Sequence, residues 1–479
     1  MTATPRMRTV LGLVAMLACA AVQGATPASH VELAPCKLPE LDTPARCGEL
    51  RLPENPELPQ GRQLRIAFAV VPATGARALP DPIVPLMGGP GEDTLSAAGV
   101  MAERFHGLRD ERDLLLVDQR GTGQSSALRC HLHDPGNAAQ NLHHLMPPAA
   151  VQACGRELAR NADLTQYTYL HFARDLEAVR IALGYGPLNL SAGSYGTRAA
   201  QVYLRAYPDS VRTAYMGSVV PIDVVTPLTM AKASQALFES TLDSCAAESG
   251  CRAAFPRLRD EFDQTLERLD AGSVQVAVPG STTVAPVGRG RYVEWLRSRL
   301  YRPGTAAQVP WLIHQAHAGN WSPVVDGIFA QAREIDAAYG FGLFYSITCA
   351  EDIAFMREGD IEASSGNTFL GDYRVRQQQA ACEHWPKATL PKGYRDPIHS
   401  PVPTMFVSGD LDAASPLWFT GRVAPGFANR VEIVARGQGH TEWSDCIGAL
   451  YEGFVRSGSA QGIDPSACPA VPRPPFRTQ

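Results

Sequence analysis

The chain has 479 residues, a formal net charge of −5 and no long run of one charge. This composition excludes a basic nucleic-acid-binding surface, so no nucleic acid is expected as a partner. The length suits one large domain with an insertion, or two to three domains. Beyond the N-terminal region, no stretch is long and apolar enough to predict a membrane span.

The N-terminal region predicts export. Two arginines precede an apolar stretch from Val10 to Val22, and small residues follow up to Ala25. This order of regions is typical of a signal peptide, here 1–25, and predicts a periplasmic or secreted protein without stable membrane insertion after cleavage. Cys19 leaves lipoprotein anchoring as an alternative, although the three residues before it make a poor lipobox.

Cysteine usage agrees with export. The chain has 11 cysteines, and removing Cys19 leaves an even number, which predicts disulfides in an oxidising compartment. Sequential neighbours enclose short loops, and our hypothesis is therefore the pairing Cys36–Cys47, Cys130–Cys154, Cys245–Cys251, Cys349–Cys382 and Cys446–Cys468. No Cys-x-x-Cys pattern occurs, which argues against a zinc ribbon or a thioredoxin-like site.

Short apolar runs that end in glycine turns predict the central strands of a sheet. The expected strands of this first part are 64–71, 82–87, 113–117, a run from Asn189 and 211–219, and the expected helices are 169–183 and 197–207. Strands that alternate with helices predict an α/β fold, with a mostly parallel sheet and helices on both faces.

The pattern then becomes mostly helical. Amphipathic stretches at 228–248, 253–269 and 291–300 predict an inserted cap, and a polar alternating piece at 274–284 predicts a hairpin or loop. Strands at 404–407 and 430–434 and a helix at 444–456 return to the sheet. We therefore expect a core formed by 26–220 and 396–479 around a helical cap at 221–395.

Ser194 carries the strongest functional signal. It lies in Gly193-Ser194-Tyr195-Gly196, between an expected strand and an expected helix. Strand, sharp turn and helix are the geometry of a nucleophile elbow, which exposes the serine hydroxyl above a sheet edge. Ala192 stands where the elbow pattern usually has glycine, two positions before the serine. Its single methyl group is the smallest possible increase in side-chain size in this crowded turn.

A serine nucleophile needs a base, and the base needs a carboxylate. Two later strands end in such groups: His440 follows the last strand, and Asp410 and Asp412 follow the strand before it. The order serine, acid, histidine is that of α/β-hydrolases, and the carboxyl ends of parallel strands meet at one edge of the sheet. These residues predict a catalytic triad in which Asp410 and Asp412 compete for the acid role.

Stabilising an oxyanion requires two backbone N–H donors. The residue after the nucleophile, Tyr195, supplies one. The loop Gly88-Gly89-Pro90-Gly91 after an early strand is the expected source of the second, and Gly89 is our candidate.

Together these segments resemble the proline iminopeptidase-like and tripeptidyl aminopeptidase-like serine peptidases of the α/β-hydrolase superfamily, in their exported branch. The carrying motifs are Gly88–Gly91, Asp118–Ser125, Gly193–Thr197, Gly409–Pro416 and Gly437–His440. Met87 departs from the histidine that relatives often carry, and the cap matches only loosely. The family pattern favours Asp412, three residues before Ser415-Pro416, as the acid.

The resemblance implies release of single residues or short peptides from substrates with a free N-terminus, without any metal or cofactor. It also implies acidic cap residues that hold the substrate ammonium. The candidates are Glu351 and Asp352 after Cys349, whose alternative explanation is a helix N-terminus, where acids are common.

Other polar residues are expected to be structural. Asp118 and Arg120 lie in a tight glycine turn and are expected to tie neighbouring loops together. His131, His133, His143 and His144 are expected to be solvated loop residues rather than metal ligands. Two rival functions remain open at this point: an esterase or lipase acting on small acyl substrates, and a non-catalytic binding protein on a hydrolase scaffold.

Overall fold

The computed structural model describes residues 1–2, 31–133 and 138–479. Residues 3–30 lie outside the described residues, and they include Cys19 and all of the expected signal peptide except its first two residues. Among the described residues, no helix is long and apolar enough to cross a membrane.

A sheet of nine described strands, in the order β1-β2-β3-β5-β4-β6-β7-β10-β11, forms the centre of the fold. Its strands are β1 (Ala34–Cys36), β2 (Ala45–Pro53), β3 (Gln63–Val71), β4 (Leu79–Leu86), β5 (Arg112–Val117), β6 (Leu188–Gly193), β7 (Val211–Gly217), β10 (Thr404–Gly409) and β11 (Arg430–Ala435). The neighbours from β5 to β11 pair in parallel, whereas β1, β2 and β3 pair in antiparallel and β3 is antiparallel to β5. The predicted α/β fold with a mostly parallel sheet is confirmed.

Both faces of the sheet are covered, as the continuous apolar runs predicted. In β3, Ile66, Phe68 and Val70 face one hydrophobic cluster, and Ala67, Ala69 and Val71 face another. The first cluster includes side chains of α4 (Tyr169–Ala182) and α5 (Gly196–Ala206), and the second includes side chains of α1 (Ala98–Arg104) and α17 (Asp445–Ser457). The core therefore consists of two apolar layers on either side of the sheet.

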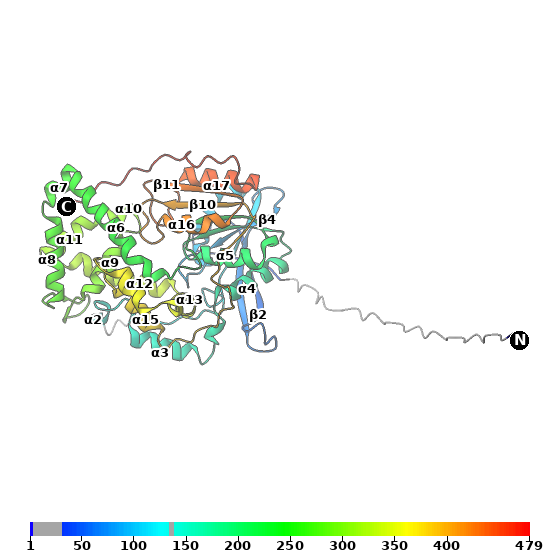
Figure 1. Ribbon diagram of the computed structural model, residues 1–479, viewed down its shortest axis with the longest axis horizontal. Coiled ribbons are helices and arrows are strands. Elements are labelled where there is room, and N and C mark those ends of the chain that lie inside the picture. Colours follow the sequence, from blue (N-terminus) through cyan, green and yellow to red (C-terminus); the bar gives the residue numbers. More distant parts are fainter. Residues whose placement is uncertain (3–30, 134–137) are drawn as a thin grey trace.

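The chain between β7 and β10 is mostly helical and lies at one side of the sheet (Figure 1). Its elements are α6 (Thr226–Ala247), α7 (Ser249–Ala254), α8 (Leu258–Asp270), β8 (Gln275–Ala277), β9 (Val284–Pro286), α9 (Arg289–Arg299), α10 (Pro303–Ala306), α11 (Val309–His317), α12 (Ser322–Ala338), α13 (Phe341–Glu351), α14 (Glu358–Ser365) and α15 (Tyr373–Cys382). The remaining α-helices are α2 (Ala138–Asn141), α3 (Pro148–Leu158) and α16 (Trp418–Val423). The limits 221–395 for a separate cap stay a prediction.

Two local expectations need revision. The amphipathic stretch 253–269 is divided between α7 and α8, because Pro256 lacks an N–H and cannot continue a helix. The sequence also did not separate β1 and β2 from the Pro-rich stretch that precedes β3. The polar piece at 274–284 does form a hairpin, in which β8 pairs with β9.

The five predicted sequential disulfides are confirmed among the described residues. The C-terminal tail adds a further tie, because it runs from α17 to the helical region, where the chain ends (Figure 1). Arg477 stacks over Trp311 with 3.5 Å between its guanidinium carbon and the ring centroid, and Arg473 donates to Ser244 Oγ at 2.7 Å.

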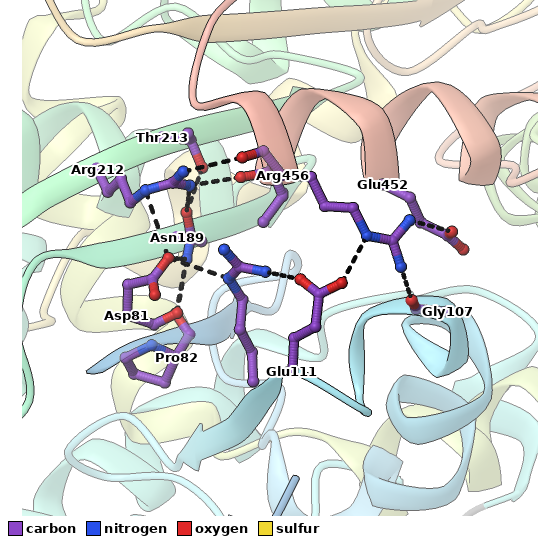
Figure 2. A network of polar contacts seen from close by, with 11 residues as sticks. Asp81, Pro82, Gly107, Glu111, Asn189, Arg212, Thr213, Glu452 and Arg456 are labelled. Atoms are coloured by element: carbon purple, nitrogen blue, oxygen red, sulfur yellow. Dashed lines mark hydrogen bonds and ion pairs between the residues drawn. The ribbon is translucent and has the colours of Figure 1, made fainter. Parts of the chain in front are cut away.

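A polar network fastens the amino ends of the central strands (Figure 2). Asp81 accepts from Arg112 Nε at 3.0 Å and from Asn189 Nδ2 at 3.0 Å. Glu111 bridges Arg112 and Arg456, at 2.6 Å and 2.9 Å, and so links the sheet to α17. These contacts lie at the strand ends opposite to Ser194, and their role is therefore mechanical.

We predict that Asp81→Ala lowers the free energy of unfolding by about 1.5–3 kcal/mol, because the buried Arg112 guanidinium loses its buried partner and keeps only the more exposed Glu111. Urea unfolding measures this loss, and the specific activity of the folded fraction should not change. Glu49→Ala is the matched control: Glu49 pairs with Arg51 and Arg65 at 3.8 Å in exposed positions, where an ion pair contributes below about 1 kcal/mol. Equal losses in the two variants would contradict the importance of the buried network.

Candidate active site

Ser194 lies where β6 ends and α5 begins, and its backbone has a φ of +50°. Non-glycine residues rarely adopt this conformation, and strain of this kind marks sharp functional turns. Ser194 N–H donates to Gly217 O at 3.0 Å, which anchors the turn to β7. Ala192 is 1% exposed and packs in the core beneath the turn, so its methyl group fits there without loss.

His440 and Asp412 form a continuous hydrogen-bond chain with Ser194. Ser194 Oγ and His440 Nε2 are 2.8 Å apart, and His440 Nδ1 and Asp412 Oδ2 are 2.9 Å apart. An Nδ1–H that donates to the carboxylate leaves Nε2 free to accept the serine proton. The sequence order of the three residues is thus matched by direct contact.

The competition between Asp410 and Asp412 is decided by geometry. Asp412 Oδ1 accepts the N–H groups of Ala414 and Ser415, both at 2.8 Å, so its carboxylate is held while Oδ2 faces His440. Asp410 accepts instead from Gly437 N–H at 2.7 Å. Asp410 thus steadies the loop that precedes His440, whereas Asp412 contacts the imidazole.

The backbone of His440 is held by the helical region. Its N–H donates to Tyr301 O at 2.7 Å, and the Tyr301 ring centroid lies 5.2 Å from that of the imidazole. Thr441 N–H donates to Ser218 Oγ at 2.9 Å, which connects the same loop to the end of β7. The position of the histidine therefore depends on two segments that are distant in sequence.

The glycine loop after β4 lies directly against the serine turn. A Cβ on Gly88 would come within 2.0 Å of Gly193 O and 2.7 Å of the Ser194 Cβ, so only glycine permits this approach. Gly89 and Tyr195 line the same cavity as Ser194 and His440, which has a volume of about 670 Å³. Their backbone N–H groups remain our candidates for the oxyanion donors.

Asp352 does not lie in this cavity. It is fully buried, and its two oxygens accept from Arg198 Nη1 at 3.1 Å each. The Tyr195 hydroxyl and the Thr226 N–H also donate to it, both at 2.9 Å. With this many donors around it, Asp352 holds Tyr195 in place through the tyrosine hydroxyl and does not face a substrate.

Glu351 is also buried and is not among the residues that line the cavity. Its Oε1 accepts the Tyr169 N–H at 3.1 Å, and burial raises the pKa of the carboxyl to about 7. It is the last residue of α13, so the alternative explanation by a helix N-terminus is wrong for Glu351, whereas Asp352 does precede a 3₁₀-helix, Ile353–Phe355. The structure thus separates both candidate ammonium-binding residues from Ser194.

A different acid lines the same cavity as the serine. Glu92 lines the cavity, and burial raises the pKa of its carboxyl to about 7, against lowering contributions from the Tyr339 hydrogen bond and from His440. The Tyr339 hydroxyl donates to Glu92 Oε1 at 3.0 Å. Gly89, with a φ of +97°, leaves room for this contact. A Cβ at this position would lie 2.7 Å from Glu92 Oε1 and 2.7 Å from the Tyr339 hydroxyl oxygen. The position of Glu92 directly after Gly88–Gly91 was the available sequence signal.

The two residues expected to tie loops together do so. Arg120 donates to both oxygens of Asp175, at 2.6 Å and 2.7 Å, in a buried pair. Asp118 accepts the N–H groups of Thr94 and Leu95, at 2.8 Å and 2.9 Å. This second contact fixes the segment between the glycine loop and α1.

The solvated state expected for the loop histidines is wrong for His133. This side chain is buried, and its Nδ1 lies 2.9 Å from Asp336 Oδ1 on α12. Within the described residues, no group of three or more histidine, cysteine or acidic side chains could hold a metal ion.

Two family models match the chain. Residues 82–241 match a model described as alpha/beta hydrolase fold, and residues 367–468 match one described as TAP-like protein. Together with the sheet order and the serine turn, these matches show that the chain has the α/β-hydrolase fold. Its C-terminal part, which carries Asp412 and His440, is TAP-like.

Similar proteins include two named peptidases. The chain is 30% identical over 245 residues to serine protease Hip1 of Mycobacterium tuberculosis, a match that spans 46% of each chain, so this comparison covers about half of that relative. It is 24% identical over 470 residues to tripeptidyl aminopeptidase of Streptomyces coelicolor, across 91% of this chain and 85% of the relative. A solved proline iminopeptidase from Mycobacterium smegmatis is 14% identical with a TM-score of 0.40, covering 86% of this chain and 98% of that one.

We predict that Asp412→Ala lowers kcat for p-nitrophenyl acetate by about 10⁴-fold, because the imidazole loses the group that sets its tautomer. Asp410→Ala is the matched control two residues away and should cost less than about 10-fold, since it removes only a loop contact. Steady-state kinetics on folded variants measure both values. A larger loss for Asp410→Ala would reverse the assignment.

Proposed function

We propose that this chain is an exported serine aminopeptidase that releases single residues or short peptides from free N-termini. The observation that carries the proposal is the Ser194–His440–Asp412 hydrogen-bond chain, whose serine and histidine line a cavity together with the half-buried Glu92. The relative named tripeptidyl aminopeptidase, aligned across 91% of the chain, supports a peptidase over other hydrolases.

In the proposed mechanism, Ser194 Oγ attacks the scissile carbonyl while His440 Nε2 takes its proton. The oxyanion accepts from the N–H groups of Tyr195 and Gly89, which are held in place before the reaction. His440 then returns the proton to the leaving amine, and water hydrolyses the acyl-enzyme. Asp412 holds the imidazole and balances its charge throughout.

Glu92 is our candidate for the group that binds the substrate ammonium. A carboxylate binds a compact cation well inside a cavity, and Glu92 is an acid that lines the same cavity as Ser194. The Tyr339 hydroxyl keeps its carboxyl oriented, and the bridge between Glu92 and Tyr339 joins the glycine loop to the helical region. This arrangement would place the N-terminus of the substrate close to the scissile bond.

The disulfides support export, because such bonds persist in oxidising compartments. Whether 1–25 is cleaved, and whether Cys19 carries a lipid, can be read from the mass of the mature N-terminus.

We predict that Ser194→Ala abolishes both labelling by a fluorophosphonate probe and cleavage of aminoacyl, dipeptidyl and tripeptidyl p-nitroanilides, with a loss in kcat of about 10⁶-fold. Wild-type protein should cleave at least one of these substrates and reject its N-acetylated form. Activity on acetyl esters with none on the anilides would instead support an esterase. No labelling of the wild type would support a binding protein.

We predict that the preference for free-amine over N-acetylated substrates, as a ratio of kcat/KM values, rises between pH 6 and about 7.5. The pKa of Glu92, raised to about 7, leaves its carboxyl neutral below that pH and anionic above it, so ammonium binding strengthens as the proton is lost. In Glu92→Gln the ratio should be low at every pH.

The matched control for this titration is Glu103→Gln, an exposed acid on α1 that does not line the cavity. It should keep the wild-type profile. A Glu92→Gln variant that retains both the preference and its rise with pH would overturn the role given to Glu92.

A further inference from the structure

Two arginines in the wall of the cavity lack an acidic partner. Arg104 is the last residue of α1, and Arg302 precedes α10 in the loop after α9. Both line the cavity with Ser194, and neither makes an ion pair with any acid of the described residues. Burial lowers the pKa of Arg104, Tyr215 and Tyr451 raise it, and Arg302 lowers it further, so the nearby charge is of like sign.

Arg104 is held in a defined orientation. Its guanidinium carbon lies 5.0 Å from the ring centroid of Trp443, which itself packs edge-on against Phe105 and Tyr215. A ring beneath the guanidinium satisfies its face but accepts none of the in-plane N–H groups. The donors of Arg104 are therefore oriented and remain available to a ligand.

Arg302 has a fixed relation to the proposed reacting groups. The residue before it, Tyr301, accepts the His440 N–H through its carbonyl at 2.7 Å. The loop that carries Arg302 is therefore tied to the loop that carries His440, and both residues line the same cavity. Two guanidinium groups near one another repel unless an anion lies between them, and Arg prefers the planar, two-oxygen anions.

No acid that lines the neighbouring cavities forms an ion pair with Arg104 or Arg302 in the described part of the chain. Arg302 also lines a second cavity of about 460 Å³, together with Arg297, Arg299 and Arg374. There, the buried Glu294 is engaged by Arg297 and Arg374 at 2.7 Å and 3.0 Å. Of the other acids that line these cavities, Glu92 is hydrogen-bonded to Tyr339. Glu334 lines both cavities, and burial lowers the pKa of Arg299 while the charge of Glu334 raises it.

We propose that Arg104 and Arg302 bind a carboxylate of the substrate, so that the protein favours short peptides with a carboxylate near the scissile bond. The inference rests on the proposed peptidase function of Ser194. The carboxylate can come from two sources, the C-terminus of a short peptide or an Asp or Glu side chain near the scissile bond. Together with Glu92, the pair gives the cavity separate receptors for the positive and the negative group of one peptide.

The test compares substrates that differ only in a carboxylate. Tetra-alanine is assayed as free acid and as C-terminal amide, and amidated pentapeptides carry Glu or Gln at each position in turn. We expect wild-type kcat/KM, measured by liquid chromatography and mass spectrometry, to favour the acid of at least one pair by about 10-fold or more. The acid–amide pair reports the C-terminal carboxylate, and the Glu–Gln pairs report a side chain.

The arginine variants then locate the effect. Arg104→Gln and Arg302→Gln should each bring the acid-to-neutral ratio toward one, whereas Arg77→Gln, an exposed arginine outside the cavity, should leave it unchanged. Each ratio is internal to one protein sample, so partial misfolding of a variant does not alter it. A wild-type ratio of one in every pair, or an unchanged ratio in both variants, would overturn the proposal.

The same ratio can be measured without peptide chemistry. Mono-p-nitrophenyl glutarate and its methyl ester differ only in a free carboxylate, and we expect the wild type to favour the former in the same Arg104-dependent way. Failure to cleave any free-amine peptide would contradict the peptidase function alone. Ser194-dependent peptide cleavage with ratios of one would contradict the carboxylate site alone.

Discussion

The buried contact between Asp352 and Arg198 is the constraint on which the arrangement of the site depends. Arg198 lies in the first turn of α5, four residues after Ser194, and Asp352 follows α13 of the helical region. Neither charge can remain buried alone, because the cost of desolvating one ion is met only by the other. The Tyr195 hydroxyl joins the same carboxylate. The helical region therefore cannot shift without disturbing the residue beside the serine.

This constraint explains why Asp352, one of the two acids expected to bind the substrate, lies outside the cavity. A carboxylate surrounded by donors from Arg198, Tyr195 and Thr226 has little capacity left for an ammonium group. Glu92 reaches the cavity because it belongs to the loop that also carries Gly88 and Gly89. The resemblance proposed Glu351 and Asp352 as ammonium-binding acids, whereas the structure buries both outside the residues that line the cavity of Ser194.

Much of the fold was predictable because its signals are local. Apolar runs ending in glycine turns correctly located β4 and β5, an alternating and then apolar run located β3, and neighbouring cysteines correctly predicted the disulfides. The signals that failed are also informative. The short antiparallel strands β1 and β2 lie among prolines and are formed by pairing with β3, which no local pattern records. The division between α7 and α8 could have been predicted, because Pro256 cannot continue a helix.

For the site, the sequence by itself determined which residue types were present and in which order: a serine in a strand–turn–helix context, then an acid, then a histidine. The family pattern favoured Asp412 over Asp410, and the structure shows that Asp412 contacts His440. Only the tertiary structure decided that Glu92 shares the cavity of Ser194, and that Arg104 and Arg302 line it without an acidic partner. The physical reason is that the order of strands along the chain and the residues that form turns are encoded in neighbouring residues. Contacts between charged side chains arise instead from the packing of segments that lie far apart along the chain.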